Sequence, residues 1–198
     1  MADASPADST ASRNETDCPV VRRAGELVSL FHPDVEGFAR LRSAVAADVP
    51  EPYAGLLAHN SHMTVAMERF HGGPVSLRVV AEHAAAEGAS EGRYAREILL
   101  ANGDGRVVQY GIVRIDLSAL PAASREAILE KGAPLGRILI ASGMHRDVHE
   151  VELLEVTPGP GFGQLMEASA ATYGRVAEIR LNGRPAVELL EVVPSFAG

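Results

Sequence analysis

The chain of 198 residues has very little cysteine, and this shortage limits how it can be stabilised. Cys18 is the only cysteine, so no disulfide can form within the chain and no cysteine cluster can hold a metal. Stability must come from a hydrophobic core instead, and a chain of this length can bury a substantial one.

Long apolar runs and an excess of basic residues are also missing. No stretch approaches the roughly 20 apolar residues of a membrane span. The N-terminus lacks the basic region and apolar core of a signal peptide. The formal net charge is -8 at pH 7, whereas proteins that bind nucleic acids or anionic membranes show a basic stripe. We therefore expect a cytoplasmic protein whose partner is neither a membrane nor a nucleic acid.

Common metal, phosphate and nucleophile motifs are absent from the sequence. His59 and His62, and likewise His145 and His149, have the close spacing of metal ligands, but neither pair belongs to an HExxH pattern. The glycines form neither a P-loop nor a GxGxxG motif after a strand, and no Gly-x-Ser-x-Gly elbow occurs. We therefore expect neither a metal nor a cofactor.

Composition divides the chain into a short tail and one domain. Residues 1–19 begin with small, polar and acidic residues without apolar periodicity, which predicts a flexible tail. A partner-binding arm is the alternative interpretation. Residues 20–198 are expected to form a single domain, because this length favours one domain over two.

Apolar patterns predict strands with a few helices. Helical patterns cover residues 35–47 and 118–131, residues 134–140 are a short apolar segment, and residues 157–161 resemble a loop. Strand-like patterns cover residues 63–70, 75–83, 94–100, 106–116, 148–156, 173–181 and 185–193.

Short connections between these strands favour antiparallel pairing. Asn182-Gly183 between two apolar runs is a strong signal for a hairpin. Because both faces of the strands are largely apolar, the sheet must be covered by helices or curl around a closed interior. We expect an α+β fold with a single antiparallel sheet of about six strands.

Charged residues share strand faces with apolar side chains. Arg96 alternates onto the face of Tyr94 and Ile98, and Arg114 and Glu191 also have apolar neighbours. An arginine fork binds a carboxylate, and a glutamate in an apolar pocket can exchange a proton near neutral pH. Such a set suits a small aromatic or cyclic carboxylic acid with a hydroxyl. The alternative is a structural ion pair between strands.

Residues 94–100, Tyr-Ala-Arg-Glu-Ile-Leu-Leu, resemble a strand of the chorismate pyruvate-lyase family, the 4-hydroxybenzoate synthases. Further segments match in the family's order and indicate a divergent branch, over roughly residues 56–194. These segments are Ser61-His62-Met63-Thr64, Pro134-Leu135-Gly136-Arg137, Arg146-Asp147, Tyr173-Gly174-Arg175, Gly183-Arg184-Pro185 and Glu191.

The resemblance implies a ligand in a closed internal pocket under helical flaps. It also implies a lyase without a cofactor, which converts chorismate to 4-hydroxybenzoate, or an isomer, and pyruvate. By carry-over, Arg96 and Glu191 are the catalytic residues: Arg96 holds the ring carboxylate and Glu191 the hydroxyl end, with Glu188 as its rival. The implied substrate-binding residues are Met63, Leu135 through its backbone, Gly136, Arg114 and Arg146.

One departure from the family leaves the function open. The family's bacterial lyases carry a second arginine on the strand that follows, where this chain has Gly111 or Ile112, and Arg114 is a nearby substitute. The alternatives to chorismate lyase are a non-catalytic domain that binds or senses an aromatic acid, and a lyase-like enzyme for a related cyclic acid. In every case the expected partner is a small molecule.

Overall fold

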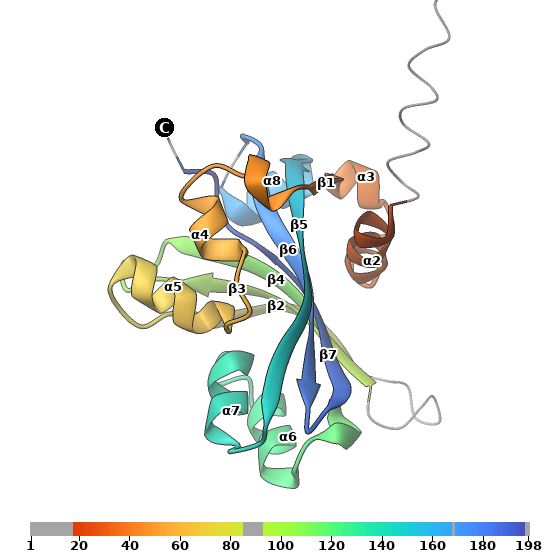
Figure 1. The fold of residues 1–198 in the computed structure, drawn as a ribbon, viewed down its shortest axis with the longest axis vertical. Helices are drawn as coiled ribbons and strands as arrows, with labels where there is room; N and C mark the ends of the chain where they lie inside the picture. The colour runs from red at the N-terminus through yellow and green to blue at the C-terminus, as the bar shows by residue number, and fades with distance from the viewer. Residues whose placement is uncertain (1–17, 85–92, 168, 197–198) are drawn as a thin grey trace, which may run out of the picture.

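One seven-stranded antiparallel sheet organises the fold. The computed structural model describes residues 18–84, 93–167 and 169–196. The strands stand in the order β1-β5-β6-β7-β4-β3-β2, and helices pack on both faces (Figure 1). The strands are β1 (Ala39–Ala44), β2 (Ser76–Ala84), β3 (Arg93–Ala101), β4 (Val107–Asp116), β5 (Arg146–Pro158), β6 (Thr172–Leu181) and β7 (Arg184–Val192).

Helices divide between the two faces of the sheet. Figure 1 shows α4, α5, α6 and α7 on one side, which we call the cavity face, and α2 on the other, which we call the back face. The helices are α2 (Pro19–Val28), α3 (Val35–Phe38), α4 (Tyr53–Leu57), α5 (Met63–His71), α6 (Ala122–Leu129), α7 (Leu135–Ala141) and α8 (Pro160–Met166), with 3-10 turns η1 (Ala46–Asp48) and η2 (Leu117–Ala119).

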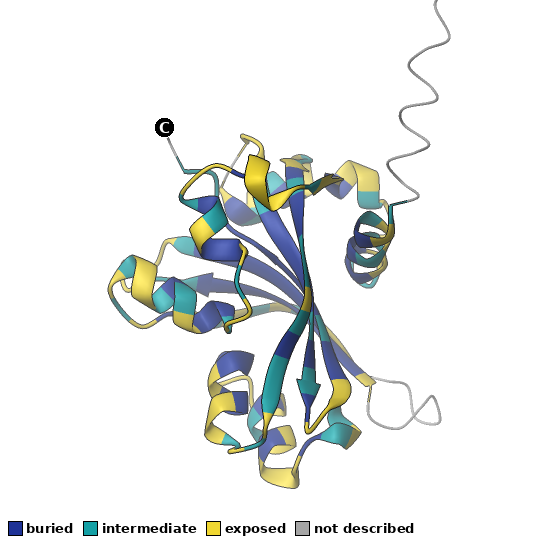
Figure 2. Ribbon diagram, viewed as in Figure 1, coloured by how far each residue is buried: buried dark blue, intermediate teal, exposed yellow. Residues whose placement is uncertain are grey.

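The cavity face carries two adjoining apolar clusters. Met63 and Met67 of α5 pack with Ile98 of β3 in one cluster, and Leu135 and Leu139 of α7 belong to the other. The central strands are buried almost throughout, while the outer sides of the helices are exposed (Figure 2). These helices therefore roof the middle of the sheet.

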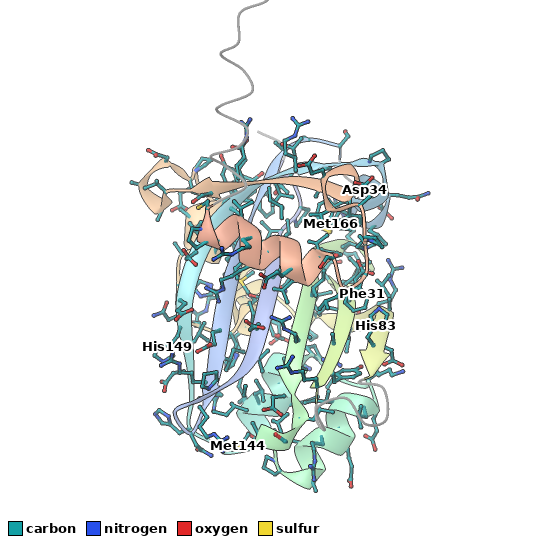
Figure 3. All side chains as sticks on the ribbon, turned by 90° about the vertical axis from the view of Figure 1, so that its right-hand side faces the viewer. Phe31, Asp34, His83, Met144, His149 and Met166 are labelled. Carbon is teal, nitrogen blue, oxygen red and sulfur yellow. The ribbon has the colours of Figure 1, made fainter. Side chains whose placement is uncertain are left out.

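The back face is covered chiefly by α2 and α8. Leu27 of α2 and Phe162 of α8 pack with Tyr110 of β4 in a third apolar cluster. In Figure 3, which looks onto this face, α2 lies across the strands, and Phe31 beyond its end stacks on His83 of β2 with ring centroids 4.9 Å apart. This contact ties the end of α2 to the edge of the sheet.

The expected α+β class with a single antiparallel sheet is confirmed. The hairpin at Asn182-Gly183 is also confirmed, because it joins β6 to β7. Both turn residues have positive φ, 50° and 79°, as a type I′ turn requires.

The strand predicted over residues 63–70 is wrong, because these residues form α5. Met63 and Met67 are one helical turn apart and both are buried. The helix ends where Gly72 adopts a left-handed conformation with φ 71°. The helical spacing of the methionines and this terminal glycine were the signals that identify a helix here.

The helix predicted over residues 35–47 is also wrong beyond Phe38. The chain turns there into β1, which pairs with β5 at the edge of the sheet. Buried Ala39 and Leu41 alternate with exposed Arg40 and Arg42, a period of two that adds a strand to the expected sheet. The loop expected at residues 157–161 also contains the start of α8, which has Pro160 in its first turn.

The tail predicted for residues 1–19 lies largely outside the described residues, and α2 begins at Pro19. The helix predicted over residues 118–131 is shorter, since η2 and then α6 occupy this segment. Within the part of the chain that the structure describes, no helix is long and apolar enough to cross a membrane.

Candidate functional site

A small cavity of about 30 Å³ lies between the cavity face of the sheet and helices α5 and α7. Most of its lining is apolar, and five polar side chains reach it, as is usual for a ligand site. The apolar lining and glycine are Met63, Ile98, Leu100, Val113, Pro134, Leu135, Gly136, Val148, Ile179 and Leu189. The polar lining residues are His62, Thr64, Gln109, Arg175 and Glu191.

Glu191 lies on β7, which pairs with β6 on one side and with β4 on the other. Arg175 is its direct partner on β6. Its Oε2 accepts from Arg175 Nε at 2.8 Å, and its Oε1 accepts from Gln109 Nε2 at 3.3 Å. Both carboxylate oxygens of Glu191 therefore have a partner inside the protein.

Arg175 is almost completely buried, with its side chain 1% exposed. Besides Glu191, its Nη1 donates to the carbonyl of His59 at 2.7 Å, and its Nη2 to that of Ser61 at 3.0 Å. Nη1 also lies 3.5 Å from the carbonyl of Leu57. Arg175 thus fixes the loop between α4 and α5 to the sheet.

Arg96 of β3 is fully buried on the same face, 0% exposed. Val113, which lines the cavity, is its direct partner on β4, and Ile98 lies two residues along β3. Arg96 Nη1 donates to the carbonyl of Ile128 in α6 at 3.3 Å, whereas Nε and Nη2 have no hydrogen-bond partner among the residues that the structure describes. The guanidinium is therefore buried with two unmet donor nitrogens.

The groups around Arg96 only partly offset the effect of burial on its pKa. Burial lowers the pKa of the guanidinium, while the Tyr94 hydroxyl and the Glu82 carboxylate raise it. That carboxylate is already engaged: Glu82 accepts from Tyr94 at 2.8 Å and from Lys131 at 2.5 Å. Burial, followed by Glu82, raises the pKa of Tyr94 to about 12. Glu82, the acid that raises the pKa of Arg96, is therefore already hydrogen-bonded to two other groups.

Helices α5 and α7 meet closely above the cavity. A Cβ atom on Gly136 would lie 2.8 Å from Thr64 Oγ1, so the crossing requires a glycine at this position. Arg137 of α7 forms an ion pair with Glu68 of α5 at the surface. We refer to α5 and α7 together as the cover.

Two lining residues, His62 and Val148, also border a wide surface pocket of about 720 Å³. Arg146 Nε donates to His62 Nε2 at 3.1 Å between the two spaces. Burial, then Arg146, then Arg175 lower the pKa of His62, which favours the neutral ring that accepts this hydrogen bond. The surface pocket therefore adjoins the cavity at His62.

The structure brings together only some of the residues predicted for the site. Met63, Leu135, Gly136 and Glu191 line the cavity. Arg96 lies beside it on the same face, and Arg146 borders the surface pocket.

Arg114 does not join this group. It points to the opposite side of β4 from Val113, and its Nε donates to Glu188 Oε2 at 2.6 Å. Glu188 is its direct partner on β7. The structure therefore places Glu191, and not its rival Glu188, at the cavity.

Gln109 and Arg175 line the cavity but were not among the predicted site residues. Each breaks an apolar strand face: Gln109 shares its face with Val113, and Arg175 shares its face with Ile179. The same signal identified Arg96 and could have found both. Within the described ranges, no three His, Cys, Asp or Glu side chains form a group that could hold a metal ion.

The comparisons with known proteins give structural likenesses only. No family model matches the sequence, and no curated protein matches it. The effector domain of PhnF from Mycobacterium smegmatis is similar with a TM-score of 0.48 and 14% identity, over 68% of this chain and 89% of that one.

Two further solved structures resemble the chain. The ligand-binding domain of a GntR-family transcriptional regulator from Bordetella bronchiseptica, itself described as putative, has a TM-score of 0.46 and 14% identity, over 61% of this chain and 86% of that one. The C-terminal domain of the histidine utilization repressor from Pseudomonas syringae has a TM-score of 0.41 and 13% identity, over 63% and 96%. At these values the likenesses carry no argument about the ligand.

This finding corrects the prediction of an enzyme. The three similar structures are domains of regulators, two of them described as effector or ligand-binding domains, and none is described as a lyase. The resemblance to chorismate lyases therefore stays a prediction from sequence motifs. The expected lack of a nucleic-acid partner also stays a prediction.

Proposed function

We propose that this chain is a binding domain for a small carboxylic acid, which it holds between the sheet and the cover without changing it chemically. The observation that carries the proposal is Arg96, a guanidinium that is 0% exposed and has two unpartnered nitrogens. A buried donor without a partner costs about 1–3 kcal/mol, so a fold gains little from keeping this arginine unless something binds it.

The unpartnered atoms of Arg96 have the geometry of a receptor. Nε and Nη2 form one side of the planar guanidinium, and their two N–H groups point in the same direction. This side matches the two oxygens of a carboxylate. Nη1, on the other side, is held by the carbonyl of Ile128, which fixes the orientation of the fork.

The cavity beside Arg96 offers a mainly apolar wall, with Ile98, Val113 and Leu135 among its lining residues. An apolar wall next to a cation suits an acid that carries a ring or a branched hydrocarbon. The ligand class is therefore a small acid with an apolar body, its carboxylate at Arg96.

The polar groups of the cavity favour binding over catalysis. Glu191 gives one oxygen to Arg175 and the other to Gln109, and His62 Nε2 accepts from Arg146. A general acid or base must reach the proton that it transfers. Among the described residues that line the cavity, both candidates for this role are engaged with protein partners.

Ligand binding requires the cover to move. The cavity is small, about 30 Å³, and α5 and α7 lie over it, so a ring acid needs these helices to move apart before it can enter. The surface pocket of about 720 Å³ meets the cavity at His62 and Val148. We expect the ligand to enter there as α5 and α7 separate.

Calorimetric titration with benzoate tests the proposal. Wild type should bind benzoate saturably and should not bind benzamide, which has the same ring but no charge. Arg96→Met should weaken benzoate binding about thirtyfold or more, because a buried charge pair is truncated. Arg114→Met is the matched control, since Arg114 pairs with Glu188 on the other face of the sheet.

The proposal fails if wild type does not bind benzoate, or if Arg96→Met binds it as well as wild type does. Chorismate provides a second check on the absence of chemistry. We expect no release of pyruvate above the rate without protein, and protein-dependent release that Arg96→Met abolishes would contradict a pure binding role.

A further inference from the structure

Gln109 is a buried polar residue that the proposed carboxylate site does not use. It is 2% exposed and lines the cavity from β4. Its Nε2 donates to Glu191 Oε1 at 3.3 Å, whereas its Oε1 is buried without a hydrogen-bond partner in the described part of the chain. The side chain therefore presents an unmet acceptor at the cavity wall.

The orientation of the Gln109 amide is dictated by its neighbour. An ionised carboxylate only accepts hydrogen bonds, and Arg175 Nε donates to the other oxygen of Glu191. Turning the amide over would place its oxygen against a carboxylate oxygen, two acceptors in contact. Gln109 Oε1 must therefore remain the atom that is left for another donor.

Each carboxylate oxygen of Glu191 already accepts one hydrogen bond, from Arg175 or from Gln109, whereas Gln109 Oε1 accepts none from the described residues. We infer that Gln109 selects a ligand with a hydrogen-bond donor, a hydroxyl or an amino group, on the body of the acid. This inference rests on the proposed function, because it assigns a second contact to the same ligand.

A trapped water is the competing partner for Gln109 Oε1. The cavity of about 30 Å³ has room for a water, which a ligand must displace when it binds. A ligand donor that displaces this water restores the hydrogen bond, whereas a ligand without a donor leaves Oε1 unmet. Discrimination of about tenfold to a hundredfold follows from the cost of an unmet buried acceptor.

The test compares benzoate with 3-hydroxybenzoate and 4-hydroxybenzoate by calorimetric titration of the full chain. Wild type should bind at least one hydroxybenzoate tenfold or more tightly than benzoate. Gln109→Leu, close in size to glutamine, should bring the ratio of the hydroxybenzoate affinity to the benzoate affinity near one. Gln109→Met is a second variant with the same expectation, in case the first does not fold.

The outcomes separate the two proposals. If wild type binds all three acids equally, or if both variants keep the wild-type ratio, the role of Gln109 is wrong. If Arg96→Met still removes benzoate binding in that case, the proposed carboxylate site at Arg96 is supported even though the role of Gln109 is not. If wild type binds none of the three acids, both proposals fail together.

Discussion

Two arginines on the cavity face of the sheet are almost equally buried but differ in their hydrogen-bond partners. Arg175 has an acid partner in Glu191 and donates to the carbonyls of His59 and Ser61. Arg96 has a single carbonyl partner, in Ile128, and two nitrogens without any. The two side chains are 1% and 0% exposed.

The comparison teaches that the list of hydrogen-bond partners, more than burial, separates a structural arginine from a candidate receptor. A satisfied buried cation holds the parts that satisfy it, here the loop between α4 and α5 and strand β7. An unsatisfied one destabilises the empty protein and stabilises the complex. The predictions below test this difference.

The largest expected effect is on stability. Arg175→Met leaves the carboxylate of Glu191 buried without its charge partner and should lower the free energy of unfolding by about 3–5 kcal/mol. Arg96→Met removes a buried charge with two unmet donor nitrogens and should raise the free energy of unfolding of the ligand-free protein by about 1–3 kcal/mol. Urea unfolding of both variants against wild type measures the difference. Equal losses in the two variants would remove the distinction between the arginines.

The second prediction concerns histidines near Arg175. Burial and then Arg175 lower the pKa of His59, and burial, Arg146 and Arg175 lower that of His62. As the pH falls, these histidines therefore take up protons near pH 6.5 in the unfolded chain. In the folded chain they do so only at a lower pH. The free energy of unfolding should fall as the pH drops below that value.

Urea unfolding at pH 7.5 and pH 5.5 measures this loss. His62→Gln should make the loss smaller, and His145→Gln, at an exposed position, is the control. A wild type that gains stability on acidification over this range would contradict the prediction.

The smallest effect is expected for a third arginine, Arg137, whose ion pair with Glu68 lies at the surface of the cover. Its side chain is 46% exposed, and exposed pairs contribute about 0–1 kcal/mol. Arg137→Met should therefore change the free energy of unfolding by no more than that, again by urea unfolding. A loss as large as that of Arg175→Met would mean that this surface pair holds the cover in place.

Strand patterns with a clear local signal were predictable, and elements decided by packing were not. The hairpin at Asn182-Gly183 follows from turn chemistry alone. By contrast, Thr64 and Val65 are β-branched and favour a strand, and the identification of α5 depends on Met63 and Met67, which are one helical turn apart and both buried. Short apolar runs of this kind are ambiguous from periodicity alone.

For the candidate site, the sequence identified the unusual residues but not their partners. Alternation along β3 and β7 marked Arg96 and Glu191 as charges among apolar neighbours. It could not tell that Glu191 faces Arg175, or that Arg114 faces Glu188, because strand order decides which strands meet. The pairing of β7 with both β4 and β6 is a long-range contact that no local pattern contains.

The place of β7 in the sheet has a consequence for how the chain is made. Strands β2, β3 and β4 form one continuous meander and β5, β6 and β7 another, and the two are joined only where β7 pairs with β4. β7 follows the other six strands of this sheet along the chain, so the sheet closes only after those six have left the ribosome. Until then the unpaired edge of β4 is exposed, and such edges invite aggregation. We expect nascent chains that stop before residue 184 to depend on chaperones.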